Sequence, residues 1–192
     1  MSTSKPRNRI GKCLVVAAAL FSASYLVDRS KARADNIDRE LVRQAPKVMD
    51  YLRKKGYQNV GVLTFRVQRD GKQPALRGSL MNNNMADRIE NALVLAINPE
   101  KPIQVIENAR DTAGKRLKNA SYRTPSDRKE LFDVRYQLPL QVQNRYASAD
   151  AFVTGKVAVS PDYRNTKITI EAFDKKRPKV FSKVHEFDVK TD

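Results

Sequence analysis

The stretch Gln58–Gln68, QNVGVLTFRVQ, decides the fold because it is apolar on both of its alternating faces. Val60 and Val62 are expected on one face, and Leu63 and Phe65 on the other. A β-strand without a polar face has to lie between two layers of structure. The stretch therefore predicts a central strand that is covered on both sides, and the rest of the chain has to supply the cover.

Amphipathic helices are predicted before and after this strand. Apolar side chains recur at helical spacing over residues 36–55, and Gly56 follows as a stop. Pro46 interrupts that pattern, so either one kinked helix runs from Ile37 or the packed helix begins with Pro46 in its first turn. A second, longer helix is predicted over residues 79–97, where large apolar side chains fall four positions apart.

The remaining elements follow the second helix. Ile103–Ile106 comes after a long crossover, which predicts a strand parallel to the first. Ser126–Tyr136 is typical of a short helix. Alternating apolar residues predict a hairpin of Ala151–Ser160 and Thr166–Asp174, and the charged face of Lys179–Val189 is expected at an edge. The predicted fold class is α/β: a three-layer-like mixed sheet of about five strands, with a central parallel pair and C-terminal antiparallel hairpins, packed by two main helices.

The first 34 residues are predicted to be an export signal and not part of the fold. A positively charged start precedes the apolar run Cys13–Val27, and Ala-Arg-Ala at residues 32–34 fits the small-x-small rule for cleavage. Cleavage after Ala34 would leave residues 35–192 as a single α/β domain with no membrane span. The alternative is an uncleaved anchor, although the run is shorter than the ~20 residues that a spanning helix needs. Without paired arginines, the general secretory route is favoured, so the protein is expected in the periplasm or outside the cell.

The charge of the chain changes when this segment is set aside. The full chain has a net charge of +16, and residues 1–34 hold seven basic and one acidic side chain. The remaining chain keeps 30 basic and 20 acidic side chains, a net charge of +10. This excess favours anionic partners at a surface. For an exported protein, acidic lipid head groups, cell-wall polymers and acidic glycans are favoured over nucleic acid.

Two segments carry much of the positive charge. Residues 108–125 show little periodicity and contain Tyr122, and residues 174–179 form a basic turn after the predicted hairpin. Solvated surface is the simpler interpretation of both, and an anion-binding loop is the alternative. The last turn of the first helix, residues 53–55, is also basic, which suits the negative end of the helix dipole. The candidate anion-binding residues are Arg110, Lys115, Arg116, Lys118, Arg123, Lys175, Lys176, Arg177 and Lys179.

The sequence supplies few residues for catalysis or for holding a metal. The only cysteine, Cys13, lies in the export segment, and the only histidine, His185, falls on the last predicted strand. These two residues cannot make a usual zinc site, and no nucleophile stands in a recognisable catalytic turn. The glycines are too scattered to cradle a phosphate. We therefore predict no catalytic, metal or cofactor-binding residues; His185 is expected to be half-exposed, with pH sensing as the alternative.

Paired carboxylates are the one catalytic arrangement that the sequence leaves open, because the two members can be far apart in the chain. Asp87 and Glu90 are expected to face solvent on the second helix. Glu171 and Asp174 flank the basic turn, where local salt bridges are the simpler account. A carboxylate-dependent hydrolase is therefore the least favoured function.

Three motifs together resemble a known envelope domain. They are VGVLTF at Val60–Phe65, VIEN at Val105–Asn108 and ADAFVTGKV at Ala149–Val157. Their order is similar to that of the α/β domain shared by the TolB amino-terminal domain, the curli-secretion lipoprotein and related flagellar and cell-wall lipoproteins. Asn108 stands where that family usually has arginine, and the lipid-anchor cysteine is missing. The resemblance covers most of residues 44–175 and implies an accessory binding or assembly domain without catalytic residues.

Three classes of function follow from these observations. The leading one is an exported, non-enzymatic envelope domain that binds a protein partner or assembles with itself. The second is a binder of anionic envelope polymers through residues 110–123 and 174–179, which requires the two basic segments to converge on one face. The third is the carboxylate-dependent hydrolase. The sequence does not decide the oligomeric state.

Overall fold

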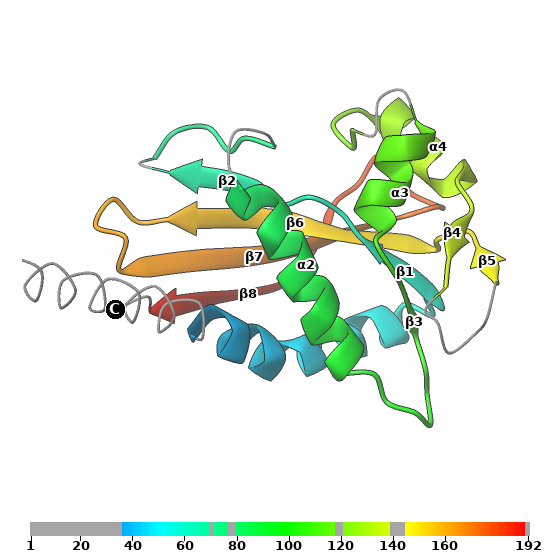
Figure 1. The fold of residues 1–192 in the computed structure, drawn as a ribbon, viewed down its shortest axis with the longest axis horizontal. Helices are drawn as coiled ribbons and strands as arrows, with labels where there is room; N and C mark the ends of the chain where they lie inside the picture. The colour runs from blue at the N-terminus through cyan, green and yellow to red at the C-terminus, as the bar shows by residue number, and fades with distance from the viewer. Residues whose placement is uncertain (1–35, 70, 77–79, 118–120, 139–144, 191–192) are drawn as a thin grey trace, which may run out of the picture.

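A mixed six-stranded sheet organises the part of the chain that the structure describes (Figure 1). This computed structural model describes residues 36–69, 71–76, 80–117, 121–138 and 145–190, so the predicted export segment lies outside it. The strand order is β3-β1-β6-β7-β8, with β2 pairing to β6 beyond the end of β1. The strands are β1 (Asn59–Val62), β2 (Arg66–Arg69), β3 (Gln104–Ile106), β6 (Ala151–Val159), β7 (Asn165–Asp174) and β8 (Ser182–Lys190).

Helices cover both faces of this sheet. The N-terminal helix, residues 36–54, and α2 (Leu80–Leu95) pack on one face, and α3 (Ala109–Arg116) and α4 (Pro125–Asp133) supply the other. Neighbouring residues of one strand join different cores: Val153 packs with the first pair of helices and Phe152 with the second. The α/β class and the layered arrangement are therefore confirmed, with six strands in place of about five.

The central position of the first strand is also confirmed. β1 lies between β3 and β6 and is parallel to both. Val60 and Val62 are buried against the first pair of helices. On the other face, a Cβ added to Gly61 would lie 2.8 Å from Ala109 Cβ and 2.8 Å from the Phe152 ring. Only glycine allows this close approach, so β1 has dense cover on both sides.

The predicted single strand is nevertheless two strands separated by a bulge. Val62 pairs with Val153 and Arg66 pairs with Lys156, so the chain carries one more residue than β6 over this interval. An extra residue reverses the alternation of side chains between the faces. Leu63 joins the second core as predicted, but Phe65 joins Val60 and Val62 in the first. The prediction that Leu63 and Phe65 share a face is wrong for this reason.

Other boundaries agree with the predictions or correct them. The N-terminal helix is continuous over residues 36–54, so of the two predicted alternatives the single helix is observed and the packed helix starting at Pro46 is not. β6 and β7 form the predicted antiparallel hairpin, and β8 lies at an edge. β3 lies at the other edge, which makes β1 and β6 the parallel pair at the centre. A short ladder of β4 (Tyr136–Gln137) and β5 (Tyr146–Ala147) was not predicted.

Helix α3 corrects the prediction of an irregular segment over residues 108–125. Its buried side chains are Ala109 and Ala113, four residues apart. Alanine gives a weak apolar signal, so this short helical stripe is hard to recognise among charged residues. Asn108 precedes the helix in the left-handed conformation, with φ 50°, and donates its backbone N–H to Glu90. That contact makes Glu90 half-buried and corrects the prediction that it faces solvent.

Candidate functional site

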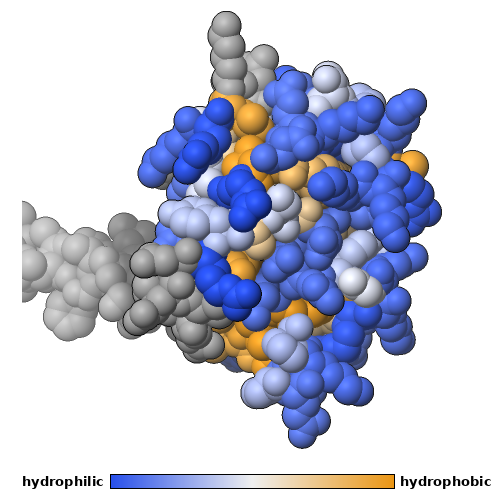
Figure 2. Space-filling view, turned by 90° about the vertical axis from the view of Figure 1, so that its right-hand side faces the viewer, coloured by the Kyte–Doolittle hydropathy of each residue, from blue (hydrophilic) through white to orange (hydrophobic). Residues whose placement is uncertain are grey.

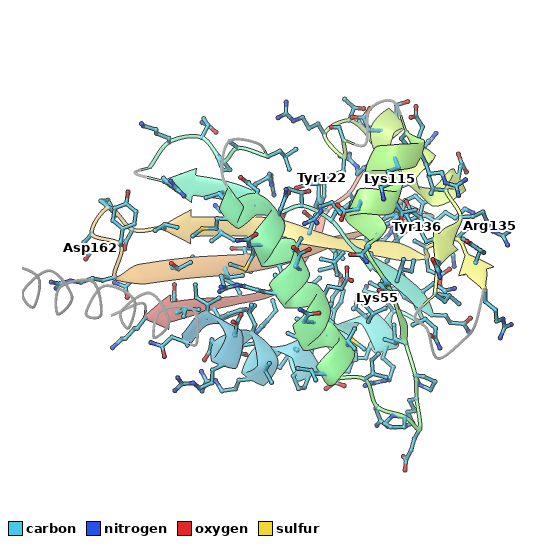
Figure 3. All side chains as sticks on the ribbon, in the orientation of Figure 1. Lys55, Lys115, Tyr122, Arg135, Tyr136 and Asp162 are labelled. Carbon is cyan, nitrogen blue, oxygen red and sulfur yellow. The ribbon has the colours of Figure 1, made fainter. Side chains whose placement is uncertain are left out.

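A groove of about 1000 Å³ lies beside α3. It is bounded by the bulge between β1 and β2, the start of α2, α3 itself and the segment that leads into α4. Tyr122 and Lys115, both of which line it, are labelled in this part of Figure 3. The lining residues are Leu63, Thr64, Leu76, Asn83, Arg110, Asp111, Gly114, Lys115, Ser121, Tyr122, Arg123, Thr124 and Asp127.

The floor of the groove is apolar and firmly held. Leu63 and Tyr122 belong to the second core, and Leu76 packs against it. The Tyr122 hydroxyl donates to the Thr64 carbonyl at 2.7 Å, and its ring lies 6.2 Å from that of Phe181. Burial raises the pKa of Tyr122 to about 12, so the phenol stays protonated and keeps this hydrogen bond at physiological pH. The bulge thus supplies the carbonyl that fixes the floor.

One wall of the groove contains a glycine whose missing side chain leaves open space. Gly114 lies within α3, and a Cβ added there would meet no atom within 4 Å. A larger residue would project into the groove without disturbing the core. This position therefore offers a way to block the groove while leaving the fold intact.

The cations that line the groove differ in whether they form ion pairs within the protein. Arg110 forms ion pairs with Asp111 at 2.8 Å and with Asp87 at 3.0 Å, and donates to the Asn83 carbonyl. Lys115 and Arg123 are exposed, and neither has an ion pair within the described residues. Arg110 is thus structural, and the other two cations are available to a ligand.

The two acids at the groove are held in their ionised form. A hydrogen bond from the Arg110 side chain lowers the pKa of Asp111. Desolvation acts to raise the pKa of Asp127, but hydrogen bonds from Thr124 outweigh it and the pKa is lowered. Asp127 and Thr124 form a capping box at the start of α4. Neither carboxyl has the raised pKa that a general acid needs.

Arg128 connects the groove to the second basic segment. Its buried side chain donates to the Tyr122 carbonyl at 2.7 Å and to the Pro178 carbonyl, and its guanidinium lies 4.7 Å from the centre of the Phe181 ring. Residues 122–123 and 178–179 are therefore joined through one buried cation. The sequence analysis did not single out Arg128, because its role depends on carbonyls from distant segments.

The predicted anion-binding residues fall into different places. Arg110, Lys115 and Arg123 line the groove, Arg116 is exposed at the end of α3 but does not line it, and Lys118 lies outside the described residues. The remaining cations occupy the turn between β7 and β8 and do not line the groove; these are Lys175, Lys176, Arg177 and Lys179.

The start of that turn is tied to the segments that precede β1 and β6. Tyr57 donates to Asp174 at 2.8 Å, and the Lys175 backbone N–H donates to the Asp150 carbonyl at 3.1 Å. Arg177 forms a local ion pair with Asp174, as predicted, whereas Glu171 pairs with Arg66. The two basic segments thus meet through the backbone at Arg128.

His185 lies on β8 and is half-buried, as predicted. Its Nε2 lies 2.8 Å from the Gln44 Oε1, and Gln44 in turn donates to Glu40. Since the Gln44 amide nitrogen is used by Glu40, Nε2 of His185 must carry the proton. Burial and the nearby Lys47 lower the pKa of His185. This contact joins the N-terminal helix to the edge strand.

Two further kinds of site, a metal centre and a membrane-spanning helix, are absent from the described residues. No group of three His, Cys, Asp or Glu side chains is placed to hold a metal ion there. None of the helices in the described ranges is long and apolar enough to cross a membrane.

The fold and the groove define a mixed α/β domain with a half-open groove on its α3 face. No protein-family model and no curated protein matches the chain. Among solved structures, the LpoB C-terminal domain from Salmonella enterica is similar, with 12% identity and a TM-score of 0.46 over 76% of this chain and 92% of that one. LpoB from E. coli gives 12% identity and a TM-score of 0.47, covering 78% and 66% of the two chains. At these values the function has to be argued from the residues of this chain, and the resemblance to the TolB group stays a prediction.

Proposed function

We propose that the chain is an exported accessory domain of the cell envelope that binds a protein partner in its groove without catalysing a reaction. The observation that carries this proposal is the groove itself, about 1000 Å³ in volume, with an apolar floor and two available cations. A buried apolar anchor supplies most of the energy at such interfaces, and charges at the rim steer the partner and fix its register. The groove offers both.

The chemistry of the rim indicates the kind of partner segment. Lys115 and Arg123 both line the groove but come from different segments, Lys115 from α3 and Arg123 from the segment before α4. Ser121 and Thr124 add hydroxyl groups beside them. The complementary ligand is a segment with an apolar side chain for the floor next to an acidic side chain for the rim.

The ionisation of the groove residues supports a binding role. Asp111 is committed to Arg110, the Asp127 carboxylate accepts the Thr124 backbone N–H in the capping box of α4, and the Tyr122 phenol is committed to the Thr64 carbonyl. A hydrolase would need one carboxyl that stays protonated and another that is free to act as a base. The groove residues are instead engaged in holding the groove together.

The test uses a photo-crosslinking amino acid at position 121 of the full chain in its native host. We expect one specific adduct with an envelope protein, which is absent when the same amino acid is placed at position 72, which is exposed and does not line the groove. Adding Gly114→Leu should reduce the adduct by about tenfold, because forcing a side chain into a packed contact costs about 1–3 kcal/mol. Gly114→Ala is the matched control and should keep most of the adduct. Equal adducts from positions 121 and 72 would contradict the proposal.

An anionic envelope polymer is the second candidate for the same groove, since three predicted cations line it. The two candidates differ in their dependence on salt and on the floor. A polymer held by Lys115 and Arg123 would dissociate steeply as ionic strength rises, and would be little affected by Leu76→Ser. A protein partner anchored on the floor would lose affinity with Leu76→Ser and respond less to salt.

A further inference from the structure

Exposed cations from distant parts of the chain gather at one end of the sheet. β6 begins and β7 ends there, because Ala151 pairs with Asp174, and β1 begins beside them. The N-terminal helix delivers its basic last turn to the same place. We call this surface the basic end; its exposed cations are Lys54, Lys55, Lys175, Lys176, Arg177 and Lys179.

Hydrogen bonds hold the segment that follows the N-terminal helix against the turn between β7 and β8. Tyr57, which follows the N-terminal helix, donates to Asp174 at 2.8 Å. Asp150 accepts the backbone N–H groups of Gln58 and Asn59, each at 2.9 Å, and its carbonyl accepts that of Lys175. The spacing of the cations is therefore fixed by the fold and does not depend on long side chains finding one another.

The turn itself is rigid. The Arg177 N–H donates to Asp174 Oδ1 at 2.8 Å, and the Val180 N–H donates to the Arg177 carbonyl at 3.1 Å, which makes two successive turns. Pro178 is buried and its carbonyl is held by Arg128. A rigid turn loses little conformational entropy when it binds.

Little acidic charge offsets these cations. Asp174 pairs with Arg177 at 3.6 Å. Lys54, Lys175, Lys176 and Lys179 have no ion pair within the described residues. Repulsion among so many close cations is relieved when an anionic surface approaches.

Two large apolar side chains are exposed at the same end. Val180, next to Lys179, is 51% exposed, and Tyr146 on β5, which leads into β6, is 49% exposed. Figure 2 shows the right-hand end of Figure 1 as a largely hydrophilic surface with apolar atoms between the polar ones. Arg135, labelled at that end in Figure 3, donates to the Tyr146 carbonyl. Cations interleaved with valine and tyrosine are typical of surfaces that rest at a lipid–water interface.

We propose that the basic end binds the anionic head groups of a lipid bilayer, with Val180 and Tyr146 resting among the lipids. A bilayer fits better than a soluble polyanion because the exposed apolar side chains gain free energy only where water is displaced by lipid. None of the basic-end cations lines the groove, so the bilayer and the partner proposed above use different surfaces.

The test measures the partition of the full chain onto vesicles of phosphatidylcholine with and without phosphatidylglycerol. All variants share the same apolar segment at residues 13–27, so its contribution cancels in their ratio. Each cation near an anionic surface contributes about fivefold, so Lys175→Ser/Lys176→Ser/Lys179→Ser should lower partition onto the anionic vesicles by about a hundredfold. Arg177 is kept so that its pair with Asp174 stays intact.

The matched control removes the same charge from the opposite end of the sheet. Lys72, Arg164 and Lys190 are exposed there, after β2, before β7 and at the end of β8. Their triple replacement by serine should change partition by about twofold or less, because charges beyond a Debye length are screened. Equal losses in both triple variants, or equal partition of the unmodified chain onto neutral and anionic vesicles, would overturn the proposal.

A second variant separates the bilayer from a soluble polyanion. Val180→Ser should lower partition onto the anionic vesicles by about threefold, because half of a valine side chain loses its apolar surroundings. The same variant should bind inorganic polyphosphate as well as the unmodified chain does. Binding to polyphosphate that depends on Lys175, Lys176 and Lys179, with no effect of Val180→Ser on vesicles, would assign the basic end to a polymer and reject the bilayer. Thermal melting of each variant checks that the fold is kept.

Discussion

The groove and the basic end both present exposed cations, but they differ in what lies beneath those cations. At the groove, cations stand around an apolar floor made by Leu63 and Tyr122. At the basic end, cations cover a turn that is tied down by Tyr57 and Asp174. In each region a tyrosine hydroxyl fixes the surface, but one donates to a neutral carbonyl and the other to a carboxylate. The density of charge along a sequence therefore does not determine what a surface can bind. The buried hydrogen-bond acceptors beneath the cations decide whether the surface forms a groove or an exposed turn.

Arg128 is the physical link between these two regions, so removing it is expected to have the largest effect. Arg128→Met keeps much of the apolar stem but leaves the buried carbonyls of Tyr122 and Pro178 without a donor. We expect the free energy of unfolding to fall by about 3 kcal/mol, measured by urea denaturation. Arg128→Lys should recover only part of the loss, because one ammonium cannot span carbonyls on both sides. A loss below about 1 kcal/mol for Arg128→Met would mean that the regions are held together by other contacts.

The tyrosine of the basic end should be the next most sensitive position. Tyr57→Phe removes a donor from a carboxylate, and hydrogen bonds to charged groups contribute about 1.5–3 kcal/mol. We therefore expect a loss of about 2 kcal/mol in urea denaturation at neutral pH.

The pH dependence of this loss sharpens the comparison. Burial acts to raise the pKa of Asp174, but the hydrogen bonds from Tyr57 and from the Arg177 backbone outweigh it and hold the pKa below its usual value of 3.8. A lowered carboxyl pKa stabilises the fold above the unfolded-state value, and this contribution is lost as pH falls through the folded-state value. The difference between Tyr57→Phe and the unmodified chain should therefore shrink as pH falls below about 4. A difference that stays constant into the acid range would show that Asp174 is not the acceptor that matters.

The tyrosine of the groove should give a smaller and pH-independent effect. Tyr122→Phe removes a neutral hydrogen bond to the Thr64 carbonyl, which contributes about 1 kcal/mol. The acceptor does not titrate, and the phenol has a pKa of about 12, so the loss should be the same from pH 8 down to below about pH 4. Urea denaturation of both phenylalanine variants over this range, which includes the acid side where the Tyr57→Phe effect should shrink, tests the contrast directly. If Tyr122→Phe were as pH-sensitive as Tyr57→Phe, the distinction between the two surfaces would fail.

Most of the strands could be predicted because periodicity is a local property. The β6–β7 hairpin and the double cover of β1 follow from the alternation of apolar residues in their own segments. The bulge could not be predicted, because the extra residue is defined only against β6, about ninety residues later in the chain. The bulge also presents the Thr64 carbonyl to Tyr122, so the floor of the groove could not be predicted from the sequence either.

The candidate site was predicted in part for a related reason. Positive charge at Arg110, Lys115 and Arg123 was visible in the sequence, but whether each cation has a partner depends on the fold. Asp87, on a different helix, forms an ion pair with Arg110, so Arg110 is not available to a ligand. The apolar floor comes from Leu63 and Tyr122, which meet only when the second core forms. Sequence reasoning therefore found the rim of the groove but not its floor.

The smallest expected effect concerns the wall of the groove and has the opposite sign. Gly114 lies inside α3, and an added Cβ would meet nothing within 4 Å. Glycine within a helix costs about 0.5–1 kcal/mol relative to alanine, so Gly114→Ala should raise the free energy of unfolding by about that amount. Gly61→Ala is the matched contrast, because its Cβ would lie 2.8 Å from Ala109 Cβ and should destabilise the fold. If Gly114→Ala also destabilised the protein in urea, the open space beside α3 would be filled, and the groove would not be available to any partner.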